Sequence, residues 1–260
     1  MIGLSDILSV GSGSIVGFAL GLLGGGGSIL AVPLLVYVVG VRSTHMAIGT
    51  SALAVAVNAF ANLIAHSRAG HVKWPCAAVF AVSGIAGAAA GAQLGQMVDG
   101  KKLLFLFGLV MVAVAGAMLT PRAAAGDPNV RITPKIAVRL VGIGLAVGLM
   151  SAFFGIGGGF LIVPAMMLGS GMATINAVGS SLVSVGTFGA TTATSYAFAG
   201  QVDWRIAALF VLGGIGGGLL GVRLAGRLST QRAALTRVFA VVVIVVAGFI
   251  LWRSAPAFFG

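Results

Sequence analysis

Long apolar runs separated by short polar connections cover most of this chain. They predict helices at residues 7–23, 28–40, 46–65, 74–96 and 103–120, and again at 136–153, 160–169, 175–199, 206–222 and 236–252. A membrane-spanning helix needs roughly 20 apolar residues. Most runs approach that length, but those at 28–40 and 160–169 are short enough to be half-helices. The pattern predicts an all-α integral membrane protein.

Each of the two short runs follows a cluster of glycines. Gly24-Gly25-Gly26-Gly27-Ser28-Ile29-Leu30-Ala31-Val32-Pro33 is repeated 131 residues later as Gly155-Ile156-Gly157-Gly158-Gly159-Phe160-Leu161-Ile162-Val163-Pro164. Glycine removes side-chain packing and proline removes a backbone donor, so a continuous helix is disfavoured in both places. We expect a broken or re-entrant helix pair at each position, which is typical of the centre of a secondary transporter.

The duplication extends beyond the glycines. At a spacing of 130, Ala47-Ile48-Gly49-Thr50-Ser51 matches Ala177-Val178-Gly179-Ser180-Ser181, and Ala69-Gly70-His71-Val72-Lys73-Trp74 matches Ala199-Gly200-Gln201-Val202-Asp203-Trp204. Between the halves, proline and charged residues give the chain its one linker-like stretch. We therefore predict a membrane repeat at 1–120, a linker at 121–135 and a second membrane repeat at 136–260.

Composition and charge support a membrane location. Hydrophobic residues make up 59% of the chain and charged residues 7%, against about 25% charged in soluble domains. The net charge of +11 comes from bases placed singly in short connections, which disfavours nucleic-acid binding. If each glycine-rich segment enters and leaves the membrane on one side, ten Lys and Arg residues lie on the side of the linker and five on the other side. If each segment crosses the membrane once, the two sides carry eight and seven. The positive-inside rule thus favours inverted repeats, a cytoplasmic linker and both termini outside.

Several kinds of chemistry are excluded by what the sequence lacks. A single cysteine, Cys76, allows no internal disulfide, and neither glycine cluster ends in the Gly-Lys-Ser/Thr of a phosphate-binding loop. All four aspartates, Asp6, Asp99, Asp127 and Asp203, map to segment ends or loops, and glutamate is absent. The sequence predicts no enzyme active site, no cofactor and no metal site. It also offers little to a cation substrate at the membrane midplane.

The candidate binding groups are backbone and neutral side chains. Irregular backbone at membrane depth must line a cavity or be covered by protein, and helices that start after the glycines would direct unpaired N–H groups toward a small anion. Polar positions of the 46–65 helix share one face with the helix-end His66. The predicted substrate-binding residues are Gly25, Gly26, Gly27, Ser28, Thr50, Ser51, Asn58, Asn62, Gly157, Gly158, Gly159, Ser180, Ser181 and Thr192. His66 and Arg68 are candidates for a proton or gating role, and the Ser/Thr set can equally serve as hydrogen bonds between helices.

The motifs resemble those of the TauE/SafE family of sulfite and organosulfonate exporters. The resemblance rests on the duplicated glycine cluster running into Val-Pro, on the Gly-Thr-Ser and Gly-Ser-Ser starts at residues 49 and 179, and on the Gly-x-Val-x-Trp ends at 70–74 and 200–204. It implies a multi-pass permease of the bacterial inner membrane that moves sulfite or related sulfur anions, usually outward. The first copy departs from the second at Gly25, in place of Ile156, and at Ser28, in place of Gly159.

The expected partners are thus a small sulfur oxyanion or sulfonate bound between the repeats, protons as a candidate coupling ion, and the lipid bilayer. Two other functions stay open at this stage. One is an anion channel or a carrier of small carboxylates, and the other is a membrane scaffold in which glycines and hydroxyls only pack helices. The sequence also leaves the choice between monomer and homodimer open.

Overall fold

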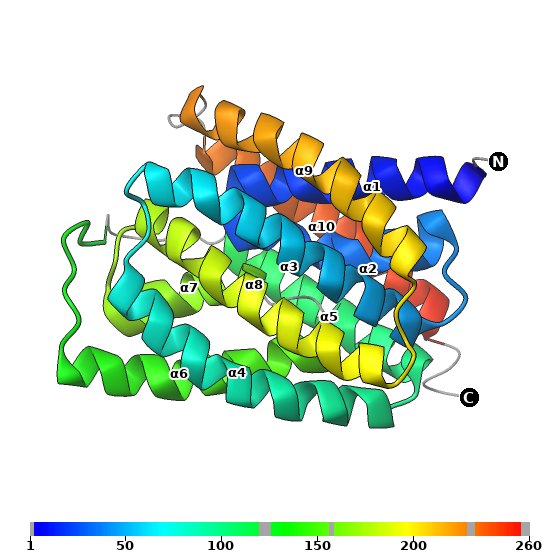
Figure 1. Cartoon of the computed structure of the whole chain (residues 1–260), viewed down its shortest axis with the longest axis horizontal. Coiled ribbons are helices and arrows are strands. Elements are labelled where there is room, and N and C mark those ends of the chain that lie inside the picture. The colour runs from blue at the N-terminus through cyan, green and yellow to red at the C-terminus, as the bar shows by residue number, and fades with distance from the viewer. Residues whose placement is uncertain (1–2, 120–125, 156–158, 228–231, 256–260) are drawn as a thin grey trace.

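The protein is a bundle of helices, most of which run along its long axis (Figure 1). The computed structural model describes residues 3–119, 126–155, 159–227 and 232–255. Within them the elements are α1 (Leu4–Leu23), the 3-10 helix η1 (Gly24–Leu30), α2 (Ala31–Pro33), the π-helix η2 (Leu34–Val39), α3 (Thr44–Arg68), α4 (Trp74–Met97), α5 (Gly100–Leu119), α6 (Pro134–Phe153), α7 (Gly159–Ser170), α8 (Thr174–Phe198), α9 (Trp204–Arg227) and α10 (Arg232–Ser254).

The prediction of an all-α membrane protein is confirmed. The described residues form helices and no strand, and seven of the helices, α1, α3, α4, α5, α6, α9 and α10, are long and apolar enough to cross a membrane. The helix α8 is as long as α3 but is not among these seven. Each apolar run of the sequence is helical, and the run at 28–40 is divided among η1, α2 and η2.

The first glycine cluster turns the chain back along α1. The helix ends at Leu23, η1 follows, and a Cβ on Gly27 would overlap the backbone of Ala19 and Leu20. The returning segment ends at Gly40, whose φ of 82° is in the left-handed region that glycine tolerates. The starts of α1 and α3 both contact the start of α9, so the chain enters and leaves this part of the bundle at one end (Figure 1).

The segment around α6 and α7 has the same form at the opposite end of the bundle (Figure 1). The helix α6 ends at Phe153, Gly155 has a φ of 68°, and α7 begins at Gly159. The residue after α7, Gly171, accepts a hydrogen bond of 2.9 Å from the N–H of Asp127, which precedes α6. The end of α7 therefore lies beside the loop that leads into α6.

Two parallel helix pairs flank an antiparallel central pair. The helices α1 and α9 run parallel, because a Cβ on Gly17 would collide with Gly214 while the two helix starts are joined by an ion pair. The helices α4 and α6 also run parallel, because Gly84 lies beside Gly144 and Gly148, and Gly95, later in α4, lies beside Phe153 at the end of α6. Between these pairs α3 and α8 cross in opposite directions, and α5 packs on α10. Backbone thus touches backbone in both flanking pairs, which only glycine permits.

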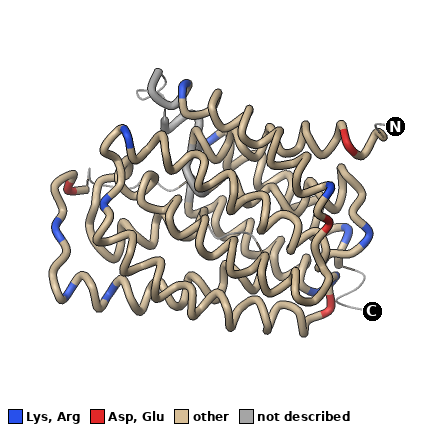
Figure 2. The backbone as a smooth tube through the Cα atoms, in the orientation of Figure 1, with Lys and Arg blue, Asp and Glu red and all other residues tan. Residues whose placement is uncertain are grey.

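Charged residues lie at the two ends of the bundle and leave the middle apolar (Figure 2). The end that carries the loop at 126–133 holds, by position in the elements, Arg68, Lys73, Arg131, Lys135, Arg139, Arg223, Arg227, Arg232 and Arg237. The opposite end holds Arg42, Lys101, Lys102, Arg205 and Arg253, together with Asp6, Asp99 and Asp203. The positive-inside rule predicts that the first end faces the cytoplasm. Arg122, in the predicted linker, lies outside the described residues.

Replacing Gly217 by alanine should destabilise the bundle, because the added Cβ would collide with the Ser14 carbonyl oxygen of α1. Overpacking of this kind costs about 1–3 kcal/mol, which thermal unfolding of the detergent-solubilised protein would record as a lower melting temperature. The matched control is Gly216→Ala in the next position of α9. A Cβ there meets nothing within 4 Å, so its melting temperature should match that of the wild type or exceed it. Equal melting temperatures for both variants would contradict the packing described above.

Candidate functional site

The glycine-rich segments and the central helices meet inside the bundle. The 3-10 helix η1 contacts both α7 and α8, so the first glycine cluster lies against two helices of the second half of the chain. Gly26, Gly27, Ser28 and Gly159 are buried there, and Gly25 is part of η1. Two of the predicted binding residues, Gly157 and Gly158, lie outside the described residues. Buried non-α-helical backbone at this depth is the arrangement that a small-anion site requires.

Thr50 and Ser180 connect the two halves of the chain. The Thr50 hydroxyl oxygen accepts a hydrogen bond of 2.9 Å from the N–H of Asp203, directly before α9. Ser180 accepts one of 2.8 Å from the N–H of Lys73, directly before α4. Both hydroxyls are fully buried. Each therefore satisfies a backbone donor at a helix start, and its contact with a substrate stays a prediction.

The other predicted hydroxyls bond within their own helices. Ser51 donates to the Ile48 carbonyl oxygen at 2.9 Å, Ser181 to that of Val178 at 2.8 Å, and Thr192 to that of Phe188 at 2.9 Å. A hydroxyl has one proton to donate. As they stand, these three side chains offer only lone pairs, and each must rotate before it can donate to an anion.

The two asparagines of α3 differ from the hydroxyls and from each other. Their face of α3 packs against α9, where glycines make room: a Cβ on Gly218 would lie 2.9 Å from the Asn62 side-chain nitrogen. That nitrogen donates to the Asn58 backbone oxygen at 2.9 Å. Asn58 is fully buried, and neither atom of its amide finds a hydrogen-bond partner among the described residues. Among the described residues, the Asn58 amide thus has no protein partner that competes with a bound anion.

Two buried serines were not among the predicted binding residues. The hydroxyls of Ser184 in α8 and Ser151 in α6 are fully buried and unpartnered within the described part of the chain. Ser184 follows Ser180 by four residues, so it shares a helix face with it, and that spacing could have identified it. Ser151 stands alone in an apolar helix, and its only sequence signal is its position four residues before the glycine at 155.

The two residues predicted for a proton or gating role are placed differently. His66 is 6% exposed at the end of α3, with its ring centroid 5.6 Å from that of His71. Arg68, two residues later, is exposed. His66 therefore belongs to the interior, whereas Arg68 belongs to the charged end. Within the described ranges, no three of the His, Cys, Asp and Glu side chains come together as metal ligands.

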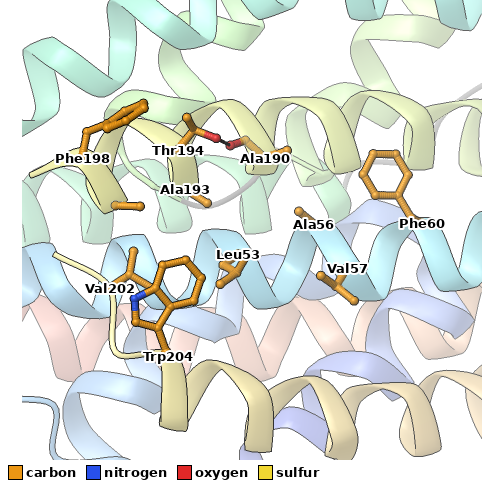
Figure 3. A pocket seen from close by; sticks show the side chains of 11 residues that line it. Leu53, Ala56, Val57, Phe60, Ala190, Ala193, Thr194, Phe198, Val202 and Trp204 are labelled. Atoms are coloured by element: carbon orange, nitrogen blue, oxygen red, sulfur yellow. Dashed lines mark hydrogen bonds between the residues drawn. The ribbon is translucent and has the colours of Figure 1, made fainter. Parts of the chain in front are cut away.

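Two grooves lined by described residues lie away from the predicted binding residues. One, of about 440 Å³, runs between α3 and α8, with Trp204 toward one end and Phe60 toward the other (Figure 3). Another, of about 720 Å³, lies between α1 and α9 beside the 2.7 Å ion pair of Asp6 and Arg205. Both are lined mainly by apolar side chains, and none of the predicted binding residues lines either one. Their lining suits the contact of a membrane protein with lipid.

Comparison with known proteins gives a consistent result. The family described as "Sulfite exporter TauE/SafE" matches residues 9–250. A "Probable membrane transporter protein" of Xylella fastidiosa strain 9a5c is 53% identical over 251 residues, which cover 96% of each chain. "Probable membrane transporter protein YunE" of Bacillus subtilis is 27% identical, with 88% of this chain and 91% of that protein covered. These names indicate a membrane transporter rather than an enzyme. No solved structure gives a significant match.

Thr50→Val should destabilise the protein by about 1 kcal/mol, because the Asp203 N–H loses its acceptor while the side-chain shape is kept. Ser180→Ala should act in the same way through Lys73. Thermal unfolding in detergent measures both effects. The control is Thr194→Val, at an exposed position where the hydroxyl bonds only to its own helix. If all three variants have the same melting temperature, the Thr50 and Ser180 hydroxyls do not stabilise the starts of α9 and α4.

Proposed function

Because this chain is a membrane transporter of the TauE/SafE family, we propose that it is a secondary transporter that exports a small sulfur-containing anion, such as sulfite or an organosulfonate, across the bacterial inner membrane. The anion binds between the two halves of the chain, at backbone N–H groups of the glycine-rich segments and at the Asn58 amide. The family's description supplies the class of substrate, and the residues of the interior supply its chemistry.

The observation that carries the proposal is the unpartnered amide of Asn58 in an interior without negative charge. Asn58 is fully buried in α3, and an amide nitrogen carries two donors. The aspartates of the chain lie at the start of α1, before α5, in the loop at 126–133 and before α9. An anion at the level of Asn58 therefore meets donors and no carboxylate.

The contacts between the halves support inverted repeats with the boundaries 1–120, 121–135 and 136–260. Thr50 accepts a hydrogen bond from Asp203, and Ser180 accepts one from Lys73. Thr50 corresponds to Ser180 at a spacing of 130, and Lys73 corresponds to Asp203, so the two bonds are equivalent. The antiparallel course of α3 and α8, which correspond at this spacing, also supports repeats of opposite orientation. In transporters of this kind, alternating access arises when one repeat rocks against the other around a central site.

The proposal is tested by reconstituting the purified protein in liposomes and recording uptake, with the accompanying current, for sulfite, sulfate, thiosulfate, small sulfonates, carboxylates and chloride. We expect saturable flux of sulfur anions at carrier rates. Flux of carboxylates alone would overturn the substrate class, and turnover far above carrier rates would indicate a channel. Vesicles that contain folded protein and carry none of these anions would favour a scaffold.

Asn58→Leu should separate transport from stability. Removing an unsatisfied buried amide leaves the melting temperature unchanged or raises it. Loss of a hydrogen bond to a charged substrate should lower the ratio kcat/KM for the transported anion about tenfold or more. The same substitution at the exposed Asn129, in the loop before α6, is the control and should change neither quantity. Wild-type flux in Asn58→Leu would remove this residue from the site.

A further inference from the structure

A second group of buried polar atoms lies near the end of the bundle where α1 begins and α10 ends. Tyr196, in the last turn of α8, is fully buried, and its hydroxyl has no hydrogen-bond partner within the described ranges. The same holds for Nδ1 of His45 and Oε1 of Gln201. The rings of Tyr196 and His45 lie 6.2 Å apart, and the N–H of Gln201 donates to the Tyr196 carbonyl oxygen at 2.8 Å. We call these three residues the Tyr196 cluster.

The Tyr196 hydroxyl borders the second glycine-rich segment. A Cβ on Gly95 of α4 would lie 3.3 Å from this hydroxyl and 2.5 Å from the carbonyl oxygen of Phe153, the last residue of α6. On the other side, Ile48 of α3 packs against Gly155. The absent side chain at position 95 thus leaves the hydroxyl beside the point where α6 gives way to the glycines. The cluster is therefore adjacent to the proposed pathway.

Glycine also shapes the other side of the cluster. A Cβ on Gly49 would lie 2.8 Å from the Cβ of Tyr196 and would overlap the carbonyl oxygen of Gln201. Any side chain at position 49 would displace both residues. The close approach of α3 to the end of α8 thus depends on this glycine, and it holds Tyr196 in its buried position.

Charged groups of both signs and a helix start lie near the cluster. His45 is the second residue of α3, near the positive end of a 25-residue helix whose N-cap Ser43 makes no side-chain cap. Thr44 contacts Gly100, which precedes Lys101 and Lys102 at the start of α5. The nearby carboxylates accept hydrogen bonds from backbone N–H groups, Asp99 from Lys101 and Lys102 and Asp203 from Ile206.

Orphaned buried hydroxyls are rare in native proteins, because each costs about 1–3 kcal/mol unless a partner is supplied. The unpartnered atom of Gln201 is its amide oxygen, which accepts, whereas the Tyr196 hydroxyl can donate one hydrogen bond to an oxyanion. Bound water can satisfy the same groups. A site that holds only water does not change its stability when the anion is added, whereas an anion site does.

We propose that the Tyr196 cluster is a second anion-binding station on the transport path, at the end of the bundle opposite the loop at 126–133, where the Tyr196 hydroxyl donates to an oxygen of the sulfur oxyanion. This inference rests on the proposed function and adds to it the point at which the anion is held before release. The residue 130 positions earlier, His66, occupies the corresponding place near the other end, beside His71. The two ends of the path thus use different side chains.

The test compares single-atom deletions at the only two tyrosines of the chain. Tyr196→Phe should raise the KM for sulfite uptake into liposomes about tenfold, and should abolish most of the sulfite-dependent rise in melting temperature of the purified protein. The melting temperature without sulfite should stay equal or increase, because an unsatisfied hydroxyl is removed. The control, Tyr37→Phe, removes the same atom from η2, where Tyr37 packs edge-on against Phe249, and should leave both readouts unchanged.

The outcomes separate this inference from the proposed function. A wild-type KM and a wild-type sulfite response in Tyr196→Phe, while the wild type carries sulfite, overturn the station and leave the proposed function standing. A lower melting temperature with an unchanged KM means that the cluster holds only water, which also overturns it. If the wild type carries a different anion, the same comparison is made with that anion. If the wild type neither carries nor responds to any anion, both proposals fail.

Discussion

The structure depends on one constraint: inside a membrane, every backbone polar group must be bonded or covered by protein. The glycine-rich segment after α1 leaves regular α-helix over 24–39, and the chain can do so only because other elements enclose it. Here α1 lies on one side of the returning segment and α7 and α8 lie on others. The close approach that this enclosure requires is provided by glycine, at Gly27 against the backbone of α1 and at Gly155 against Ile48.

The same residue type holds the flanking pairs together. In a bilayer, lipid tails are as apolar as leucine, so helices associate through close packing and polar contacts rather than through the hydrophobic effect. The α1/α9 and α4/α6 pairs meet backbone to backbone at glycines. Each of these pairs combines a helix from before the linker with one from after it, so the glycine contacts hold the two halves of the chain together. The hydrogen bonds of Thr50 and Ser180 join the halves at two further helix starts.

A nearly symmetric scaffold carries different chemistry in its two halves. Thr50 and Ser180 have the same role, but Asn58 corresponds to Phe188 and His66 to Tyr196 at the spacing of 130. Phe188 fills the place that Gly84 leaves, as Asn58 fills that left by Gly214. The two ends of the bundle also have different aromatic pairs, His45 with Tyr196 and His66 with His71.

The sequence by itself determined the number and position of the helices, because apolar runs of spanning length have few alternatives in a membrane. It also located both glycine-rich segments and the matching motifs at 47–51 and 177–181. It could not determine which hydroxyls are free to donate, because Ser51, Ser181 and Thr192 bond to carbonyls of their own helices and Thr50 and Ser180 to distant backbone N–H groups. Nor could it show that Asn58 and Tyr196 are left without partners. Those properties depend on which helices pack together, and helix packing is decided only in the tertiary structure.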